Sequence, residues 1–203
     1  MKRLLALFVL IVASASAHAE APAILVFGDS ISAGYGLPLE QGWVELLRTR
    51  LKSQGYGYEV VNASVSGETT AGGLARLPRA LELHHPSVVI LELGGNDGLR
   101  GLPIAQMRAN LTQMATLSNA AGAKILLLGM RMPPNYGPEY TKQFAMVFSD
   151  LAAEKKTALV PFLLTDIALS SELLQADDIH PNARGQPILL DNVWPALKPL
   201  LHK

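Results

Sequence analysis

The fold class follows from the stretch Ala23-Ile24-Leu25-Val26-Phe27-Gly28-Asp29-Ser30. Its first five residues form a continuous apolar run, which is typical of a strand that is buried on both faces of a sheet. Four similar runs follow along the chain and predict further strands at Tyr58–Asn62, Ser87–Leu91, Lys124–Leu128 and Ala158–Phe162. Strands of this kind belong to parallel sheets covered by helices, so the pattern predicts an α/β fold with a five-stranded parallel sheet.

The segments between these strands carry the spacing of amphipathic helices. The clearest apolar stripe falls at i, i+3, i+4 and i+8, in Trp43, Leu46, Leu47 and Leu51. A similar stripe consists of Ile104, Met107, Leu111 and Met114. Three more helices are predicted over Thr70–His84, Tyr140–Lys156 and Ile188–Leu201. Pro78 and Pro195 fall inside two of these ranges, where a proline is expected to kink or divide a helix.

Length and composition narrow the classes of function. The chain has 203 residues, with 17 Lys and Arg against 17 Asp and Glu. Its length suits one domain, and the balanced charge argues against a dedicated nucleic-acid binder, which needs an excess of basic residues to neutralise phosphates. The chain has no cysteine, which excludes disulfides, zinc-thiolate sites, iron–sulfur clusters and a cysteine nucleophile.

The N-terminus has the pattern of a secretory signal. Two basic residues precede an apolar run over residues 4–12, and Ala-His-Ala at residues 17–19 supplies the small residues of a cleavage site. A membrane anchor is the weaker interpretation, because the run is shorter than the roughly 20 residues needed to span a bilayer. The pattern predicts a signal peptide over residues 1–19 and a single mature domain over residues 20–203 that is periplasmic or secreted, without stable membrane insertion.

Ser30 follows the first predicted strand directly. Open parallel sheets bind their ligands beyond the carboxyl ends of the strands, and a serine delivered there is placed as a nucleophile should be. The surrounding sequence is not the Gly-x-Ser-x-Gly elbow, because Ser32 occupies the last position of that pattern. It is not a phosphate-binding loop either, because no Gly-Lys-Ser/Thr follows. On this segment alone, a serine that merely caps the next helix explains the pattern equally well.

A candidate general base comes from the other end of the chain, in Asp177-Asp178-Ile179-His180-Pro181. A serine hydroxyl needs a base, and an imidazole base needs a partner that orients it and stabilises its charged form. His180 and an aspartate three residues before it can supply both from one loop. The four other histidines lie in the signal, at one helix end or in the C-terminal tail: His18, His84, His85 and His202. A structural histidine and helix-capping aspartates are the alternatives.

Two other strand ends carry residues that suit an oxyanion hole. Gly67 follows the second predicted strand, and Asn96 follows the third within Gly94-Gly95-Asn96-Asp97. A tetrahedral intermediate carries its charge on one oxygen, and one preorganised side-chain donor stabilises it by about 3 kcal/mol. Turn formation alone also explains a glycine or an asparagine at such positions.

Together these segments match a family. Gly28-Asp29-Ser30, the segment around Gly67, Gly95-Asn96-Asp97 and Asp177-x-x-His180 resemble, in order and spacing, the four signature blocks of the SGNH (GDSL) hydrolases. The runs at residues 93–101 and 135–137 are similar to the periplasmic thioesterase I/protease I/lysophospholipase (arylesterase) branch.

The resemblance implies a flavodoxin-like three-layer α/β/α sandwich and assigns the roles. Ser30 is then the nucleophile, His180 the general base and Asp177 its orienting partner. The backbone N–H groups of Ser30 and Gly67 and the Asn96 side chain form the oxyanion hole. The implied reaction is hydrolysis of esters and thioesters through an acyl-serine, without metal or organic cofactor. The branch commonly has glycine where this chain has Asp178, whose side chain is expected to be solvated.

The substrate is expected to be a small-molecule or lipid ester, and the protein to be a monomer. In similar enzymes the loop corresponding to residues 130–138 helps to line an acyl pocket, and the residues predicted for its wall are Leu99, Leu102, Pro133 and Tyr136. Two alternatives remain at this point, a carbohydrate O-acetylesterase and a non-enzymatic acyl-binding module. The apolar loop argues mildly against the first, and the joint presence of Ser30, Asn96, Asp177 and His180 argues against the second.

Overall fold

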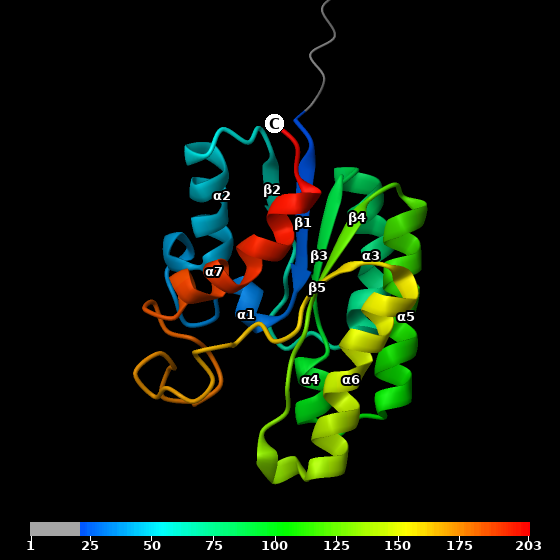
Figure 1. Ribbon diagram of the computed structural model, residues 1–203, viewed down its shortest axis with the longest axis vertical. Helices are drawn as coiled ribbons and strands as arrows, with labels where there is room; N and C mark the ends of the chain where they lie inside the picture. Colours follow the sequence, from blue (N-terminus) through cyan, green and yellow to red (C-terminus); the bar gives the residue numbers. More distant parts are fainter. Residues whose placement is uncertain (1–20) are drawn as a thin grey trace, which may run out of the picture.

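The computed structural model describes residues 21–203, so the predicted signal peptide lies outside the described residues. Its centre is a five-stranded, all-parallel sheet in the order β2-β1-β3-β4-β5 (Figure 1). The strands are β1 (Ala23–Gly28), β2 (Glu59–Asn62), β3 (Val88–Glu92), β4 (Lys124–Leu128) and β5 (Ala158–Val160). This strand order is that of flavodoxin-like folds, so the predicted fold class is confirmed.

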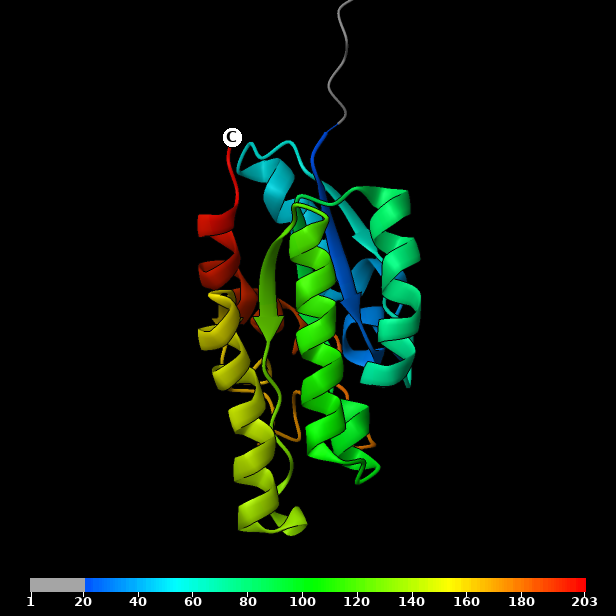
Figure 2. The same ribbon diagram turned by 90° about the vertical axis from the view of Figure 1, so that its right-hand side faces the viewer.

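Helices cover both faces of the sheet. On one face α2 (Trp43–Ser53) contacts α7 (Gln186–Leu197). On the other face α5 (Ile104–Ala120) lies between α3 (Thr70–His84) and α6 (Pro138–Lys155), as Figure 2 shows. Two short helices follow strand ends. The helix α1 (Ser30–Ala33) begins two residues after β1, and α4 (Gly95–Leu99) begins three residues after β3. Single 3₁₀ turns lie at Leu39–Gln41, Pro134–Tyr136 and Lys198–Leu200.

The core forms where the helices meet the sheet. Every residue of β1 and β3 is buried, as expected for strands covered on both faces. The predicted helical stripes face this core, because Trp43, Leu47 and Met114 are each 0% exposed. Full burial of such a side chain stabilises the fold by about 1.5–3 kcal/mol.

The structure corrects some predicted boundaries. Neither Pro78 nor Pro195 divides its helix, since α3 and α7 each continue through the proline. The last helix starts at Gln186 rather than Ile188, and its final residues form a 3₁₀ turn. The fifth strand ends at Val160 instead of Phe162, because Pro161 has no N–H to donate to a neighbouring strand.

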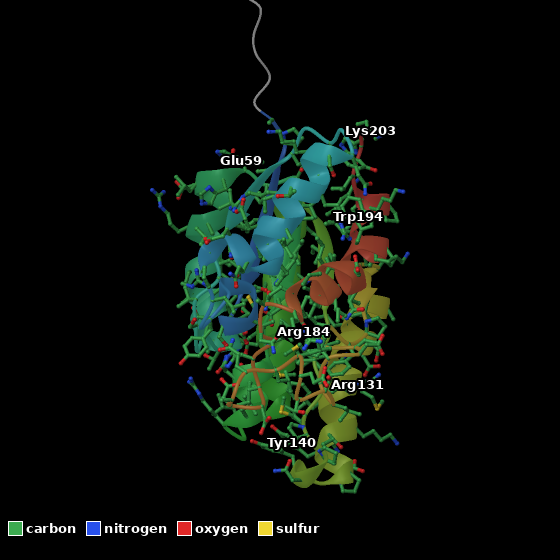
Figure 3. The ribbon with its side chains drawn as sticks, turned by 90° about the vertical axis from the view of Figure 1, so that its left-hand side faces the viewer. Glu59, Arg131, Tyr140, Arg184, Trp194 and Lys203 are labelled. Carbon is green, nitrogen blue, oxygen red and sulfur yellow. The ribbon has the colours of Figure 1, made fainter. Side chains whose placement is uncertain are left out.

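Parallel pairing brings all five carboxyl ends of the strands to one end of the molecule. Figure 3 shows the two ends of the molecule: Glu59, Trp194 and Lys203 lie toward one end, and Arg131 and Tyr140 lie toward the other. The loops after β1, β2 and β3 therefore meet at the end where ligands of such sheets bind. No helix within residues 21–203 combines the length and apolar character needed to cross a membrane.

Candidate active site

The Ser30 hydroxyl lies where β1 turns into α1. Asp29 caps this helix, because its Oδ1 accepts a hydrogen bond of 3.1 Å from the N–H of Ile31. Gly34 ends the helix one turn later in the left-handed conformation, with φ 73°. The short helix therefore holds the half-buried Ser30 rigidly at the carboxyl edge of the sheet.

His180 connects Ser30 to Asp177. Its Nε2 lies 2.8 Å from Ser30 Oγ, and its Nδ1 lies 2.6 Å from Asp177 Oδ2. The other carboxylate oxygen of Asp177 accepts hydrogen bonds of 3.0 Å from the N–H groups of Ile179 and His180. Partial burial alone raises the pKa of Asp177, but the hydrogen bonds from His180 and Ile179 together lower it to about 2. Asp177 is thus ionised at neutral pH and can fix the tautomer of His180.

Asp178 lies between the two functional residues of this loop in the sequence. Its side chain is exposed, as expected from the sequence, and its backbone is left-handed with φ 55°. Glycine adopts this conformation without strain and aspartate tolerates it, which accounts for the glycine that the similar branch commonly has here.

The three predicted oxyanion donors come from three strand ends. Among residues 21–203, the N–H groups of Ser30 and Gly67 donate to no other residue. Asn96 Nδ2 donates one hydrogen bond of 3.0 Å to Asp29 Oδ2, which leaves its second hydrogen available. Gly67 has φ 78°, a conformation that favours glycine and that sets the direction of its N–H.

A buried polar network joins the loops of Gly67 and Asn96. The Asp97 carboxylate accepts hydrogen bonds from the N–H (2.8 Å) and the Oγ1 hydroxyl (2.5 Å) of Thr70, at the start of α3. Asn110 on α5 donates to the same hydroxyl at 3.0 Å. All three residues are buried, so these bonds fix α4 relative to the loop that carries Gly67.

Two buried carboxyl groups below Ser30 were missed by the sequence analysis. Glu92 at the end of β3 is 0% exposed and accepts hydrogen bonds from Asp29 N (3.2 Å) and Ser32 Oγ (2.7 Å). Burial raises the pKa of Asp29 to about 6, and burial together with the charge of Asp29 raises the pKa of Glu92 well above 4.5. A signal was present in the sequence, because Glu92 is the only charged residue of the apolar run over residues 88–93.

The raised pKa of Asp29 predicts a pH-dependent stability. A carboxyl whose pKa is higher in the folded than in the unfolded state stabilises the fold fully below about pH 4, and this contribution is lost as pH rises through about 6. The free energy of unfolding in urea, taken as wild type minus Asp29→Asn, should therefore fall by up to about 1.4 kcal/mol per pH unit over this range. A difference that stays constant between pH 4 and 6 would contradict the shift.

Tyr35 and Gln175 are also absent from the predicted site. The Tyr35 ring lies against the His180 ring, with centroids 4.6 Å apart and planes 41° apart. Gln175 Nε2 donates to the carbonyls of Tyr35 (2.8 Å) and Pro181 (3.2 Å). These contacts tie the loop after α1 to the loop that carries His180, although the two are far apart in sequence.

The residues predicted for the acyl pocket lie on the surface. Leu99 and Leu102 are 37% and 39% exposed, and Pro133 is exposed as well. The structure brings Tyr136 to Leu99, since the tyrosine hydroxyl donates to the Leu99 carbonyl at 3.1 Å. A role in substrate binding stays a prediction for all four residues.

Other features of the surface lie apart from this site. A hollow of about 670 Å³ beside β2 is lined by residues that include Arg48, Lys52 and Tyr56, at the opposite end of the strands from Ser30. Residues 21–203 bring together no group of three or more His, Asp or Glu side chains that could hold a metal ion.

Comparison with known proteins shows the family of this chain. The model of the GDSL-like lipase/acylhydrolase family matches residues 26–188. Esterase TesA of Pseudomonas aeruginosa is 56% identical over 184 residues, which cover 91% of this chain and 92% of that protein. Thioesterase 1/protease 1/lysophospholipase L1 of Escherichia coli is 41% identical, over 91% of this chain and 87% of its own.

Solved structures agree with these matches. The crystal structure of esterase EstA from Pseudoalteromonas is 42% identical, with a TM-score of 0.84 over 87% of this chain and 97% of that one. A crystal structure of TesA has a TM-score of 0.87 and covers 88% of this chain and 99% of its own. The protein is a carboxylic ester hydrolase and belongs to the GDSL-like lipase/acylhydrolase family.

Proposed function

We propose that the protein hydrolyses carboxylic esters and thioesters through an intermediate in which the acyl group is bound to Ser30. One observation carries this proposal, the continuous line of hydrogen bonds from Ser30 Oγ through His180 to Asp177. A serine hydroxyl within 2.8 Å of an imidazole nitrogen can transfer its proton as it attacks a carbonyl carbon.

The first half of the proposed reaction forms the acyl-serine. Ser30 Oγ bonds to the carbonyl carbon while its proton passes to His180 Nε2, and Asp177 stabilises the resulting imidazolium. The carbonyl oxygen becomes an oxyanion, which the N–H groups of Ser30 and Gly67 and the amide of Asn96 stabilise. When the tetrahedral intermediate collapses, His180 returns the proton to the departing alcohol or thiol.

The second half releases the acid by the same groups. Water attacks the acyl carbon and gives its proton to His180, the oxyanion forms again in the same place, and Ser30 Oγ leaves with the proton from His180. Every proton that His180 accepts is given back within one turnover, so the side chains of this chain complete the cycle.

The relatives support an ester or thioester substrate, and the exposed side chains around the site favour an apolar acyl group. They include an esterase, an arylesterase and a thioesterase/lysophospholipase, and the EstA structure is described as inhibited by monoethylphosphonate. Each loop around the site also exposes a large apolar side chain: Tyr35, Val65, Leu99 and Ile179. Exposed apolar side chains on these loops suit an acyl chain better than a sugar, which argues against the carbohydrate O-acetylesterase.

The proposed nucleophile can be tested by covalent labelling. A fluorophosphonate should attach to one residue of the signal-free protein, and a peptide map should place the label on Ser30. Labelling elsewhere, or none in the folded protein, would overturn the proposed mechanism and favour the acyl-binding module.

The oxyanion role of Asn96 predicts a specific kinetic defect. Asn96→Ala removes a donor that strengthens its bond only as the oxyanion forms, so kcat should fall by about 100-fold while KM stays near the wild-type value. Steady-state hydrolysis of p-nitrophenyl butyrate measures both constants. An unchanged kcat with a raised KM would show that Asn96 binds the substrate instead.

The predicted acyl-binding surface can be tested through chain length. Leu99→Ser removes apolar surface beside the site, and each methylene withdrawn from water contributes about 0.8 kcal/mol. KM for p-nitrophenyl octanoate is therefore expected to rise about three- to tenfold, and KM for the acetate to change little. Leu83→Ser, at a residue 60% exposed near the C-terminal end of α3 and therefore at the end of the molecule opposite Ser30, is the matched control. Equal effects on both esters would contradict the acyl-binding role.

The proposal also covers the cellular location and the oligomeric state of the protein. We infer export of a single mature domain over residues 20–203, since the sequence of residues 1–19 has the order of a secretory signal. N-terminal sequencing of the protein recovered from periplasm and medium tests the cleavage. The protein is proposed to act as a monomer, which sedimentation tests.

A further inference from the structure

Glu92 occupies a space that Gly28 leaves open. The two residues are register partners at the carboxyl ends of β3 and β1. A Cβ on residue 28 would lie 2.6 Å from Glu92 Oε2, closer than real Cβ atoms come to a neighbour, and 3.0 Å from both the Glu92 carbonyl oxygen and Ser32 Cβ. The glycine that precedes Asp29 and Ser30 therefore makes room for a carboxyl group directly beneath the nucleophile.

The Glu92 carboxyl contacts the turn on both sides of Ser30. Its Oε2 accepts from the N–H of Asp29 at 3.2 Å and from the Ser32 hydroxyl at 2.7 Å. Its Oε1 is buried and receives no hydrogen bond from the other side chains of residues 21–203. An ionised carboxylate with one bare buried oxygen is strongly unfavourable, whereas a proton on that oxygen converts it into a donor.

The Asp29 carboxyl can accept this proton, since it belongs to the residue whose N–H lies 3.2 Å from Glu92 Oε2. Burial raises the pKa of both acids, and a hydrogen bond with Glu92 is among the contacts that lower the pKa of Asp29 again. The side chains that act on this pair from outside it are those of His180, Ser32 and Asn96, and the backbone N–H groups of Ile31, Asp29 and Ser32 also donate to it. Two buried carboxylates side by side cannot both ionise at low cost, so one proton between them stabilises the pair.

Asp29 connects Glu92 to the proposed oxyanion hole through a hydrogen bond with Asn96. Its Oδ1 accepts from Ile31 N at 3.1 Å and its Oδ2 accepts from Asn96 Nδ2 at 3.0 Å. The second bond fixes one hydrogen of the Asn96 amide and thereby sets the direction of the other. The orientation of Asn96 thus depends on a carboxylate whose own position depends on Glu92.

We propose that Glu92 is a positioning residue that stays protonated at neutral pH and donates to the Asp29 carboxylate, which in turn holds the Asn96 amide in the oxyanion hole. Glu92 touches no reacting atom in this scheme. The proposal rests on the oxyanion role proposed for Asn96, and it assigns a function to a buried acid that the proposed reaction does not use.

Two substitutions of Glu92 distinguish its hydrogen-bonding role from its role in filling space. Glu92→Gln retains an acceptor for Asp29 N and Ser32 and a donor for Asp29, so kcat should stay within about threefold of wild type. Glu92→Leu removes both functions at similar volume, so kcat should fall at least about tenfold with KM nearly unchanged. A glutamine variant that folds like wild type but loses activity as the leucine variant does would show that ionised Glu92 is needed, and would overturn the proposal.

A double-mutant cycle tests whether Glu92 acts through Asn96. Once Asn96→Ala has removed the amide, adding Glu92→Leu should lower kcat by no more than about twofold further. If Glu92→Leu lowers kcat equally with and without Asn96, it acts by another route and the proposal is wrong. If Asn96→Ala alone leaves kcat unchanged, the proposed oxyanion role fails first, so the two failures are distinguishable.

A spectroscopic measurement keeps the proposal testable even if Glu92→Leu does not fold. Infrared spectroscopy at pH 7 should show the carbonyl stretch of a protonated carboxylic acid in the wild type, and Glu92→Gln should lack it. Thermal unfolding of both proteins verifies that they are folded. Absence of this band from the folded wild type would contradict a protonated Glu92.

Discussion

Ser30→Ala is expected to lower kcat for p-nitrophenyl ester hydrolysis by about 10⁴-fold or more, with the fold unchanged. The reason is chemical, because alanine has no atom that can bond to the acyl carbon. His180 then has no hydroxyl within hydrogen-bond distance to activate, where the wild type has one at 2.8 Å. Initial rates over acetate to palmitate esters, on signal-free wild type and variant, measure the effect.

The outcome of this experiment separates classes of function. Ser30 is half-buried and its side chain contributes little to the core, so far-ultraviolet circular dichroism and the thermal unfolding midpoint should match those of the wild type. Retained hydrolysis in a folded Ser30→Ala protein would exclude the acyl-serine. Inactivity of the folded wild type on every ester would leave an acyl-binding module as the better description.

Asp177→Asn is expected to lower kcat by about 10³- to 10⁴-fold without unfolding the loop. The amide oxygen of the substituted side chain retains the two 3.0 Å hydrogen bonds from the backbone of residues 179 and 180, so its NH₂ group faces His180 Nδ1. An amide N–H there stabilises the tautomer with the proton on Nε2. That nitrogen then donates to Ser30 instead of accepting its proton. Steady-state hydrolysis of p-nitrophenyl butyrate measures the loss.

A neighbouring substitution supplies the control for Asp177→Asn. Asp178→Asn also removes one carboxylate from the loop, but this side chain is exposed, and asparagine tolerates the left-handed backbone as aspartate does. It should keep kcat near the wild-type value. Equal losses in the two variants would mean that the loss of charge, rather than the tautomer of His180, causes the defect.

The sheet and most helices could be predicted because their signals are local. A strand covered on both faces must be apolar along its whole length, as β1 and β3 are, and a helix on such a sheet must be apolar on one stripe, as α2 is. Several of the errors concern prolines. Pro161 ended β5 early, while Pro78 and Pro195 were accommodated within helices packed against the sheet. At Pro78 and Pro195, tertiary packing of the helix outweighs the unfavourable helix propensity of proline.

The candidate site residues could be proposed from the sequence because residue type and order carry their signal. Ser30, Gly67, Asn96, Asp177 and His180 each follow a predicted strand or precede the last helix, and parallel strands must bring such positions to one edge. Tyr35 and Gln175 carry no comparable signal. Tyrosine and glutamine are ordinary surface residues, and their contact with the His180 loop exists only after residues about 140 positions apart meet.

The amino-acid sequence alone was sufficient for the α/β class and for the family blocks, because apolar periodicity and residue type are properties of the chain before it folds. It was not sufficient for the state of Glu92 and Asp29. Whether a carboxyl group keeps its proton depends on its distance from water and from other charges. Those distances were set only when β1 and β3, 63 residues apart at this contact, paired and enclosed both acids beneath Ser30.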